Sequence, residues 1–243
     1  MGGTEISMER TIVIYKSKYG ATDRYAAWIG EELDCPVVEL ENFDKKSIDE
    51  YDNIIYGGGV HAGGIRGWED FKKIIKPYLD SAYYEGLEKT EGVSVTGNFS
   101  LGGFLKSYKK KQARSFVEKE MDRQVEYEQI RENYHSTKKV VCFAVGLNVQ
   151  NFDARAQLRD VNFDKRYLRP ITCYYLDGAY DPAKVKGIDE KIMGMMVKML
   201  KNKGLNATAD ERELLRRVEE GCDLVDRAQI APIIREFIPD HEF

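Results

Sequence analysis

The sequence is poor in the features that mark several large classes of protein. Its 243 residues include four cysteines, which lie far apart with no C-x-x-C pair and no metal-type spacing. We therefore expect free thiols in a reducing compartment, and neither a disulfide nor a metal site. No stretch reaches the roughly 18–20 apolar residues that a membrane span needs, and the first eleven residues lack the apolar segment of a secretory signal. These absences predict a cytoplasmic protein with no transmembrane segment.

The charge balance excludes a second group of functions. The chain has 37 basic and 41 acidic residues, for a net charge of -4, so it has no basic surplus to attract nucleic acid. We find no Ser-His-Asp grouping and no pair of carboxylates with a shared face, which leaves hydrolase chemistry without a basis. With 42% hydrophobic and 32% charged residues, the composition is that of a soluble globular protein.

The most informative segment is present near the start of the chain, over residues 11–33. Ile12–Tyr15 is a short apolar run that predicts a buried strand, and Ala26, Ile29 and Leu33 fall on one face of a helix. The turn between them carries hydroxyl groups and a glycine. Because the first N–H groups of a helix have no partner within it, such a turn can hold a phosphate. The candidate residues are Ser17, Lys18, Tyr19, Gly20, Ala21 and Thr22.

An ordinary strand-to-helix connection, with Thr22 as the N-cap, is the alternative for this turn. The turn lacks both the Gly-Lys-Ser/Thr ending of a nucleoside-triphosphate loop and the G-x-G-x-x-G pattern of a dinucleotide fold. Those two ligands are therefore disfavoured.

A second candidate site follows a predicted strand at 51–56, where five glycines occur within Gly57–Gly64. The segment is either a flexible link or a place where the backbone approaches a flat ligand beyond the carboxyl end of a strand. The candidate residues are Gly59, Val60, His61, Ala62 and Gly63. His61 is the one histidine in a candidate site, so it is our tentative catalytic residue, although a structural hydrogen bond would also explain it.

The remaining elements complete an α/β pattern. Strands are predicted at 36–40, 139–146 and 171–176, with helices at 68–78, 154–169, 210–218 and 230–237. Short links between these elements imply a doubly wound, five-stranded parallel sheet with helices on both faces. A third loop, consisting of Gly146, Leu147, Asn148 and Val149, follows the fourth strand and should meet the other two loops at the switch point of the sheet.

Residues 81–138 interrupt this alternation. A thin apolar stripe over 104–133 predicts a helix on the surface or against a partner. We therefore expect one domain over 1–243 with a mainly helical insertion between the third and fourth strands, which could dock a partner protein or form a homodimer.

Several of these segments resemble known families. Ser17, Gly20 and Thr22 resemble the phosphate loop of flavodoxins, which bind FMN. YDNIIYGGGVHAGGI (51–65) and GAYDPAKVKGIDEKIMGMMVKMLKNKG (178–204) more narrowly resemble the oxygen-independent, menaquinone-dependent protoporphyrinogen IX dehydrogenases. The resemblance implies a flavodoxin-like fold, with the FMN phosphate at the Ser17–Thr22 turn and the flavin ring between the His61 and Asn148 loops. The sequence departs from that family at His61, where an arginine is usual, and in the insertion, for which we see no counterpart.

Three functions remain open at this point. The first is an FMN-dependent oxidoreductase that passes electrons from a reduced small-molecule substrate to an acceptor such as a quinone. The second is a flavodoxin-like electron-transfer flavoprotein whose insertion docks a redox partner. The third is a protein that has lost FMN and serves only in interactions.

A methionine-rich helix is predicted at 188–201. Its apolar face consists of Ile188, Ile192, Met195 (or Met196) and Met199. Such a stripe indicates packing in the core. The alternative, suggested by the resemblance, is contact with a quinone or a membrane surface, which would make the protein peripheral to the membrane.

Overall fold

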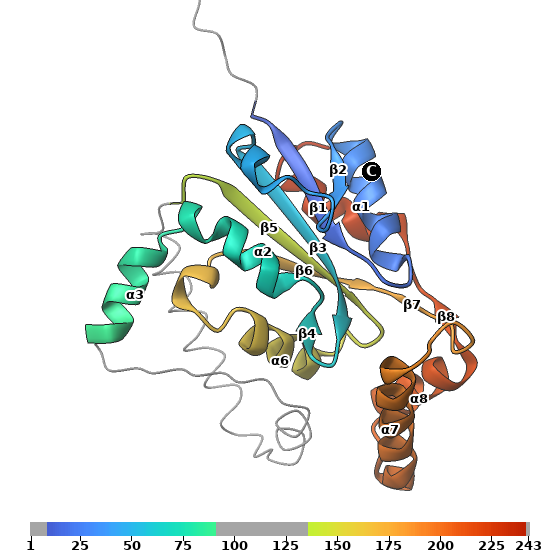
Figure 1. Ribbon diagram of the computed structural model, residues 1–243. Coiled ribbons are helices and arrows are strands. Elements are labelled where there is room, and N and C mark those ends of the chain that lie inside the picture. The colour runs from blue at the N-terminus through green and yellow to red at the C-terminus, as the bar shows by residue number, and fades with distance from the viewer. Residues whose placement is uncertain (1–8, 91–135, 242–243) are drawn as a thin grey trace, which may run out of the picture.

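The computed structural model describes residues 9–90 and 136–241, and its centre is a parallel sheet (Figure 1). The strands are β1 (Thr11–Lys16), β2 (Val37–Glu39), β3 (Asn53–His61), β5 (Lys139–Gly146) and β6 (Thr172–Asp177). They pair in the order β2-β1-β3-β5-β6, all parallel. This is the flavodoxin-like strand order, so the predicted α/β fold is confirmed. One short strand was not expected: β4 (Gly64–Ile65) pairs antiparallel with the end of β3.

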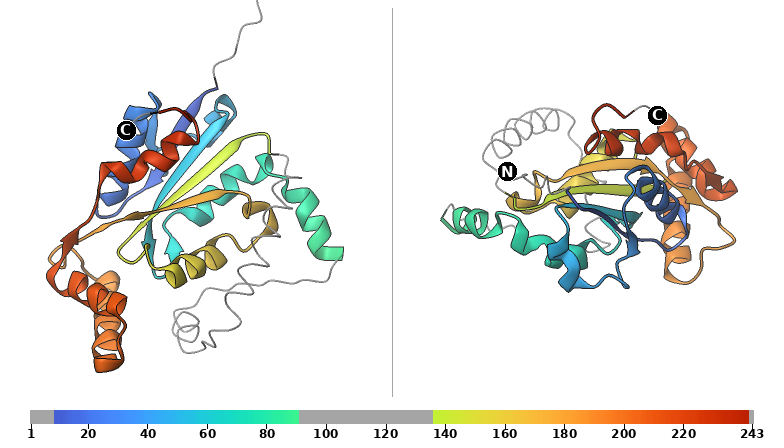
Figure 2. Two further views of the ribbon diagram at one scale, coloured as in Figure 1. Left: turned by 180° about the vertical axis from the view of Figure 1, so that it is seen from behind. Right: turned by 90° about the horizontal axis from the view of Figure 1, so that it is seen from above.

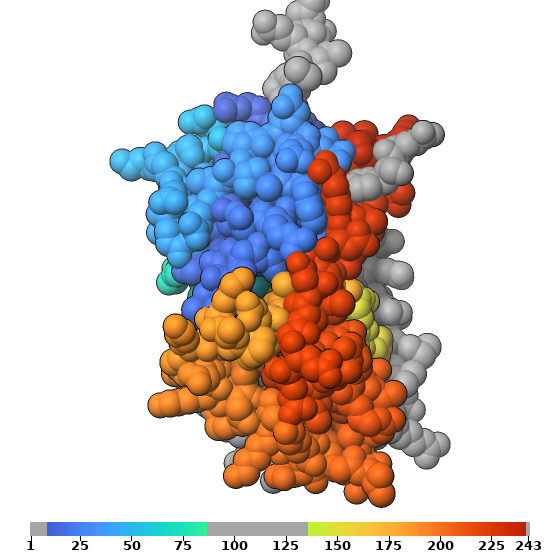
Figure 3. Space-filling view, turned by 90° about the vertical axis from the view of Figure 1, so that its right-hand side faces the viewer, coloured from blue at the N-terminus to red at the C-terminus, as the bar shows by residue number. Residues whose placement is uncertain are grey.

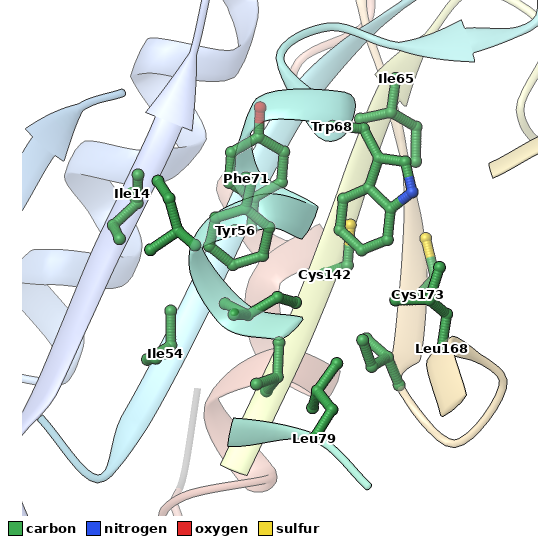
Figure 4. Close-up of a cluster of buried hydrophobic side chains, with 14 of the residues drawn as sticks. Ile14, Ile54, Tyr56, Ile65, Trp68, Phe71, Leu79, Cys142, Leu168 and Cys173 are labelled. Atoms are coloured by element: carbon green, nitrogen blue, oxygen red, sulfur yellow. The ribbon is translucent and has the colours of Figure 1, made fainter. Parts of the chain in front are cut away.

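Helices cover both faces of the sheet because its strands are apolar on both faces. On one face lie α2 (Trp68–Ile75) and α6 (Phe152–Asn162), whose side chains join Ile14, Ile54 and Tyr56 in a core cluster (Figure 4). On the other face, α1 (Ala21–Glu32) and α9 (Ala231–Arg235) pack with Val13, Ile55 and Phe143. The sheet is thus the middle of three layers, and its carboxyl end is free to carry a site.

Two predicted helices are shorter in the structure. The segment 68–78 divides into α2 and the 3₁₀ turn η2 (Lys76–Tyr78), since Pro77 cannot donate a helical hydrogen bond. The segment 154–169 ends as α6 at Asn162 and resumes as η3 (Arg166–Leu168). Asn162, the last residue of α6, is buried. Its side-chain oxygen accepts a hydrogen bond from the N–H of Ile65 in β4 at 2.9 Å.

The insertion begins with α3 (Ser81–Thr90), which follows η2 and precedes β5 in the chain. Tyr84 of this helix is buried. The helix that we predicted over 104–133 lies outside the described residues.

A helical hairpin leaves the carboxyl end of the sheet after β6 (Figures 1 and 2). It contains α7 (Ile188–Lys203), the turn η4 (Gly204–Asn206) and α8 (Ala209–Glu220). Two short antiparallel strands, β7 (Ala179–Tyr180) and β8 (Cys222–Asp223), join the hairpin to the sheet. The chain then returns through η5 (Arg227–Ile230) to α9. A further 3₁₀ turn, η1 (Lys45–Glu50), links β2 to β3.

The predicted core face of the methionine-rich helix is wrong in part. Ile188 is 71% exposed and Met195 is 47% exposed. The side chains that pack against α8 are instead those of Met193, Met196, Val197 and Leu200. Of the expected face, Ile188 and Met195 are therefore on the exposed side, whereas Met196, the alternative to Met195, packs inward and Ile192 and Met199 are half-buried.

Two further facts concern membranes and thiols. Within residues 9–90 and 136–241, none of the helices has the length and apolarity to cross a bilayer. Cys35, Cys142, Cys173 and Cys222 are free thiols.

Candidate functional site

The turn after β1 is shaped by two of its own residues. The Gly20 N–H donates to Ser17 Oγ at 3.1 Å, and Gly20 has φ 91°, a left-handed conformation that glycine adopts without strain. Gly20 is the N-cap, and α1 begins at Ala21. Thr22 is therefore the second residue of the helix, so the alternative that makes it the N-cap is wrong. The N–H groups of the first helical residues, from Ala21 to Asp23, have no partner inside the helix and face outward from its start.

The Thr22 side chain is buried without a partner. Thr22 is 3% exposed, and within the described part of the chain its hydroxyl makes no hydrogen bond. It faces Gly59 at the end of β3: a Cβ added to Gly59 would lie 3.5 Å from Thr22 Oγ1. The hydroxyl oxygen of Thr22 is not among the fully buried atoms that lack a hydrogen bond in the described residues, so it can reach a ligand held at the surface of the turn.

The glycine-rich segment is mostly strand, because β3 extends to His61. A Cβ on Gly57 would lie 2.0 Å from Phe143 Cζ, and one on Gly58 would lie 2.4 Å from Ile65 Cγ2. These two glycines thus make room for neighbouring side chains. Gly59 is the glycine of this run whose missing side chain leaves space beside Thr22.

A tight hairpin follows β3. His61 pairs with Gly64, and the two residues between them, Ala62 and Gly63, have φ of 50° and 83°. Two positive φ values define a type I′ turn, which suits the twist of a hairpin. The turn brings the chain back along β3, where the Arg66 N–H donates to the Gly59 carbonyl at 3.0 Å. Arg66 therefore reaches the same region as His61.

Only the first two residues of the loop after β5 contribute to the lining of the cleft. Gly146 and Leu147 line the cleft between the loops. Val149 is buried beneath them, with its Cγ1 2.8 Å from where a Gly146 Cβ would be. The Asn148 carbonyl accepts from the Asn151 N–H at 3.3 Å.

The structure brings most of the predicted site residues into one cleft. Those that line it are Ser17, Lys18, Tyr19, Ala21, Thr22, Gly59, Val60, His61, Ala62, Gly146 and Leu147. Those outside the lining are Gly20, Gly63, Asn148 and Val149. Gly20 and Gly63 shape the two turns, whereas Asn148 and Val149 belong to the loop that supports Gly146.

Asp189 is a central residue of the cleft, and sequence reasoning missed it. It lies in the first turn of α7 and its side chain is 6% exposed. Its Oδ2 accepts from Lys18 Nζ at 2.7 Å, from Tyr19 OH at 2.7 Å and from Arg66 Nη2 at 3.0 Å. His61 Nε2 lies 3.5 Å from its Oδ1. One carboxylate thus ties together the turn after β1 and the hairpin after β3.

The surroundings of Asp189 and His61 determine which of these two side chains is charged at neutral pH. Burial by itself would raise the pKa of Asp189, but the hydrogen bonds from Lys18 and Tyr19 and the charges nearby outweigh it and hold the pKa at about 2. Burial, together with the Arg66 charge, lowers the pKa of His61 below 6.5, against the opposite pull of Asp189. At neutral pH the cleft therefore holds an ionised Asp189 and an uncharged His61.

The mouth of the cleft belongs to the α7–α8 hairpin. Tyr180, Val185, Ile192 and Met193 line it opposite the loops of the sheet. Seen from the side, the hairpin packs directly below the β1–α1 region (Figure 3). The cleft has a volume of about 140 Å³, below the roughly 300–1,000 Å³ of typical ligand pockets. The cleft in this structure is therefore smaller than most ligand pockets.

Neither Asp189 nor Arg66 could be assigned from spacing. Asp189 is 171 residues from Lys18, and only the folding of the α7–α8 hairpin brings it back to the cleft. The one local signal was an acidic residue two positions after Gly187, in the first turn of a predicted helix. For Arg66, the signal was a basic residue just beyond the glycine run.

The residues of this cleft fit a phosphate group. The start of α1 supplies free N–H groups, Thr22 supplies a hydroxyl, and Lys18 and Arg66 supply positive charge. Gly59 leaves the space that a side chain would fill. The site also lies where β1 adjoins β3, the switch point at which flavodoxin-like sheets hold FMN. Two features of the described residues oppose FMN in this arrangement: the narrow mouth, and the Asp189 carboxylate that pairs with Lys18 and Arg66.

Comparison with known proteins found a family model that matches part of the chain. Residues 12–87 match a family model described as a flavodoxin domain, and no curated protein matches the chain. Among solved structures, a flavodoxin from the domain Archaea is similar at 10% identity, with 87% of this chain and 97% of that chain covered and a TM-score of 0.35. A flavodoxin, WrbA-like protein from Agrobacterium tumefaciens is similar at 11% identity, with 94% and 98% covered and a TM-score of 0.39. The matched segment 12–87 contains both the turn after β1 and the glycine-rich end of β3.

Proposed function

We propose that this protein binds FMN and works as a redox protein. The observation that carries the proposal is the Thr22 hydroxyl, which lines the cleft, makes no hydrogen bond within the described residues and lies at the start of α1 beside Gly59. A phosphate in the turn would accept hydrogen bonds from this hydroxyl and from the first N–H groups of α1. Bound FMN supplies hydride and single-electron transfer. The flavodoxin-domain match over 12–87 supports the same cofactor.

Within this proposal, the residues have separate roles. The Ser17–Thr22 turn would bind the phosphate, and Gly59–Ala62 and Gly146–Leu147 would flank the flavin ring. His61 is uncharged at neutral pH and exposes part of its ring to the cleft. It could therefore accept a proton at its free ring nitrogen, which makes it our candidate for proton transfer next to the cofactor.

We further propose that the protein is an enzyme of the protoporphyrinogen dehydrogenase type, which passes electrons from a reduced substrate to an acceptor such as a quinone. In support, Tyr180, Val185, Ile192 and Met193 form a mostly apolar wall that the strand-end loops do not provide. Such a wall can contact a substrate as well as the cofactor. An electron-transfer flavoprotein needs only an accessible flavin edge, so this wall favours the enzyme.

The phosphate assignment is tested by Thr22→Val, which keeps the shape of the side chain and removes the hydroxyl. A hydrogen bond to a charged group contributes about 1.5–3 kcal/mol, so the Kd for FMN should rise by roughly 10- to 100-fold. Riboflavin, which lacks the phosphate, should bind both proteins equally. Thr22→Ser keeps the hydroxyl and should bind FMN as the natural protein does. Equal FMN affinity in Thr22→Val, measured by flavin fluorescence quenching, would refute the assignment.

The reaction is tested on the FMN-loaded protein under anaerobic conditions. Formation of fluorescent protoporphyrin from protoporphyrinogen IX, dependent on a menaquinone analogue, would support the enzyme. Rapid electron exchange with a ferredoxin-type protein and no porphyrin formation would support the electron carrier instead.

A further inference from the structure

Asp189 occupies an unusual position for a carboxylate. It is buried in the first turn of α7, and three hydrogen bonds converge on its Oδ2. The donors come from the turn after β1, through Lys18 and Tyr19, and from the segment after the β3–β4 hairpin, through Arg66. This is the donor arrangement that a bound anion would use.

The contacts of Asp189 also neutralise the positive charges that line the cleft. Among the described residues that line it, Lys18 and Arg66 are the cations at neutral pH, and each is paired with Asp189. A phosphate at the start of α1 would need this charge and would also be repelled by the Asp189 carboxylate. Ligand binding and the Asp189 ion pairs therefore compete.

The position of α7 allows the competition to be resolved by movement. The α7–α8 hairpin packs largely on itself through Leu200, Leu214 and Val218. It joins the sheet through β7 and β8, which share only two residue pairs. Gly187, at the start of α7, has φ 70° and no atom within 4 Å of where a Cβ would lie, so the chain can turn there.

Other ties of the hairpin lie on α8. Arg217 Nη1 donates to the Leu147 carbonyl at 2.8 Å, and Asn151 Nδ2 donates to Asp210 Oδ2 at 2.7 Å. These bonds can persist while the first turn of α7 moves. Asp189 provides the polar contacts that hold this turn over the cleft.

We propose that Asp189 is an internal competitor for the anion site, so that a phosphate-bearing ligand must displace it and open the mouth of the cleft. Asp189 thereby sets the affinity of the site for anions: free phosphate binds weakly, and a ligand must supply further contacts to displace the carboxylate. The identity of that ligand as FMN rests on the proposed function above, whereas the competition itself concerns any phosphate.

The test is Asp189→Asn, which removes the charge and keeps the size of the side chain. The matched control is Glu190→Gln, one residue further along α7, where the same charge is removed from an exposed side chain. Each protein is titrated with FMN by fluorescence quenching and with inorganic phosphate by calorimetry. Because a contact between charged groups is worth roughly a tenfold change in Kd or more, Asp189→Asn should bind both ligands about tenfold more tightly. Glu190→Gln should stay within about twofold of the natural protein.

The two ligands separate this inference from the proposed function. Tighter phosphate binding by Asp189→Asn without FMN binding by any variant would uphold the competition and refute the cofactor. FMN binding by all variants with equal or weaker affinity in Asp189→Asn would refute the competition and uphold the cofactor. If Asp189→Asn does not fold by circular dichroism, Asp189→Ser is used with the same expectations, since serine is accepted in the first turn of a helix.

Discussion

Gly57 offers a sharp test of how the glycine-rich strand is built. It lies in β3 directly opposite Phe143 of β5, and both residues are buried. The phenyl ring covers the glycine, so a Cβ added at Gly57 would lie 2.0 Å from Phe143 Cζ and 2.5 Å from Cε2. Carbon atoms in contact normally lie about 3.5–4.0 Å apart. Gly57→Ala therefore requires the ring or the two strands to shift by more than an ångström.

The ring has little room to shift. Phe143 has no exposed surface and packs among Val13, Tyr25 and Ile55 in the cluster under α1. Overpacking of a well-packed core costs about 1–3 kcal/mol, and a contact this close in the middle of the sheet belongs at the upper end of that range. We expect Gly57→Ala to lose about 2–3 kcal/mol of unfolding free energy.

The measurement is urea unfolding followed by circular dichroism, with an unchanged m-value as the sign that the fold is kept. Gly194→Ala is the matched control, since Gly194 lies on the exposed side of α7 with nothing near its missing side chain. Removing a glycine from a helix interior should stabilise the protein by about 0.5–1 kcal/mol. The same chemical change is thus expected to have opposite signs at the two positions.

A double variant tests the cause. Adding Phe143→Leu to Gly57→Ala removes the clashing atoms, so the two changes together should cost at least 1 kcal/mol less than the sum of the single variants, a coupling of about the size seen for residues in contact. Gly57→Ala within about 0.5 kcal/mol of the natural protein would refute the packing role that we assign to this glycine.

Gly59→Ala should behave differently, although it is only two residues further along β3. Its Cβ would meet Thr22 Oγ1 at 3.5 Å and Arg66 Cδ at 3.9 Å, which are ordinary contacts. Stability should therefore change by less than about 0.5 kcal/mol, while FMN affinity should fall because the added methyl group fills the space beside Thr22. Gly57→Ala, in contrast, should leave the FMN affinity of the folded protein unchanged.

Two further predictions concern stability. Thr208 and Glu211 form a capping box at the start of α8, so Thr208→Ala should cost about 1 kcal/mol in urea unfolding, and an unchanged midpoint would contradict the role of this cap. Asp189 has a folded-state pKa of about 2, below its unfolded value near 3.9, so its stabilising contribution is present above about pH 4 and is lost as the pH falls toward 2. Asp189→Asn should therefore be less stable than the natural protein by about 2 kcal/mol at pH 6. The difference in unfolding free energy should shrink below pH 4. A difference of the same size at pH 2 would contradict the assignment of this pKa.

Local sequence patterns determined much of the fold. The apolar runs 12–15 and 139–146 are strands because β-branched and aromatic residues pack well in a sheet buried on both faces. Their order, with helical segments between them, left a flavodoxin-like sheet as the natural arrangement. The turn at Ser17–Thr22 could be recognised because a helix start with a glycine and hydroxyl groups depends on adjacent residues only.

Only the tertiary structure decided the rest, because it depends on contacts between distant residues. The sequence does not show why Gly57 and Gly58 belong to the glycine-rich segment, whereas the structure places Phe143 and Ile65 over them once the strands pair. The choice between Met195 and Met196 as the inward residue of α7 depended on where α8 packs. Asp189 was an ordinary acidic residue at the start of a helix until the α7–α8 hairpin placed it against Lys18 and Arg66, where burial and three hydrogen bonds make it the charge that a ligand must displace.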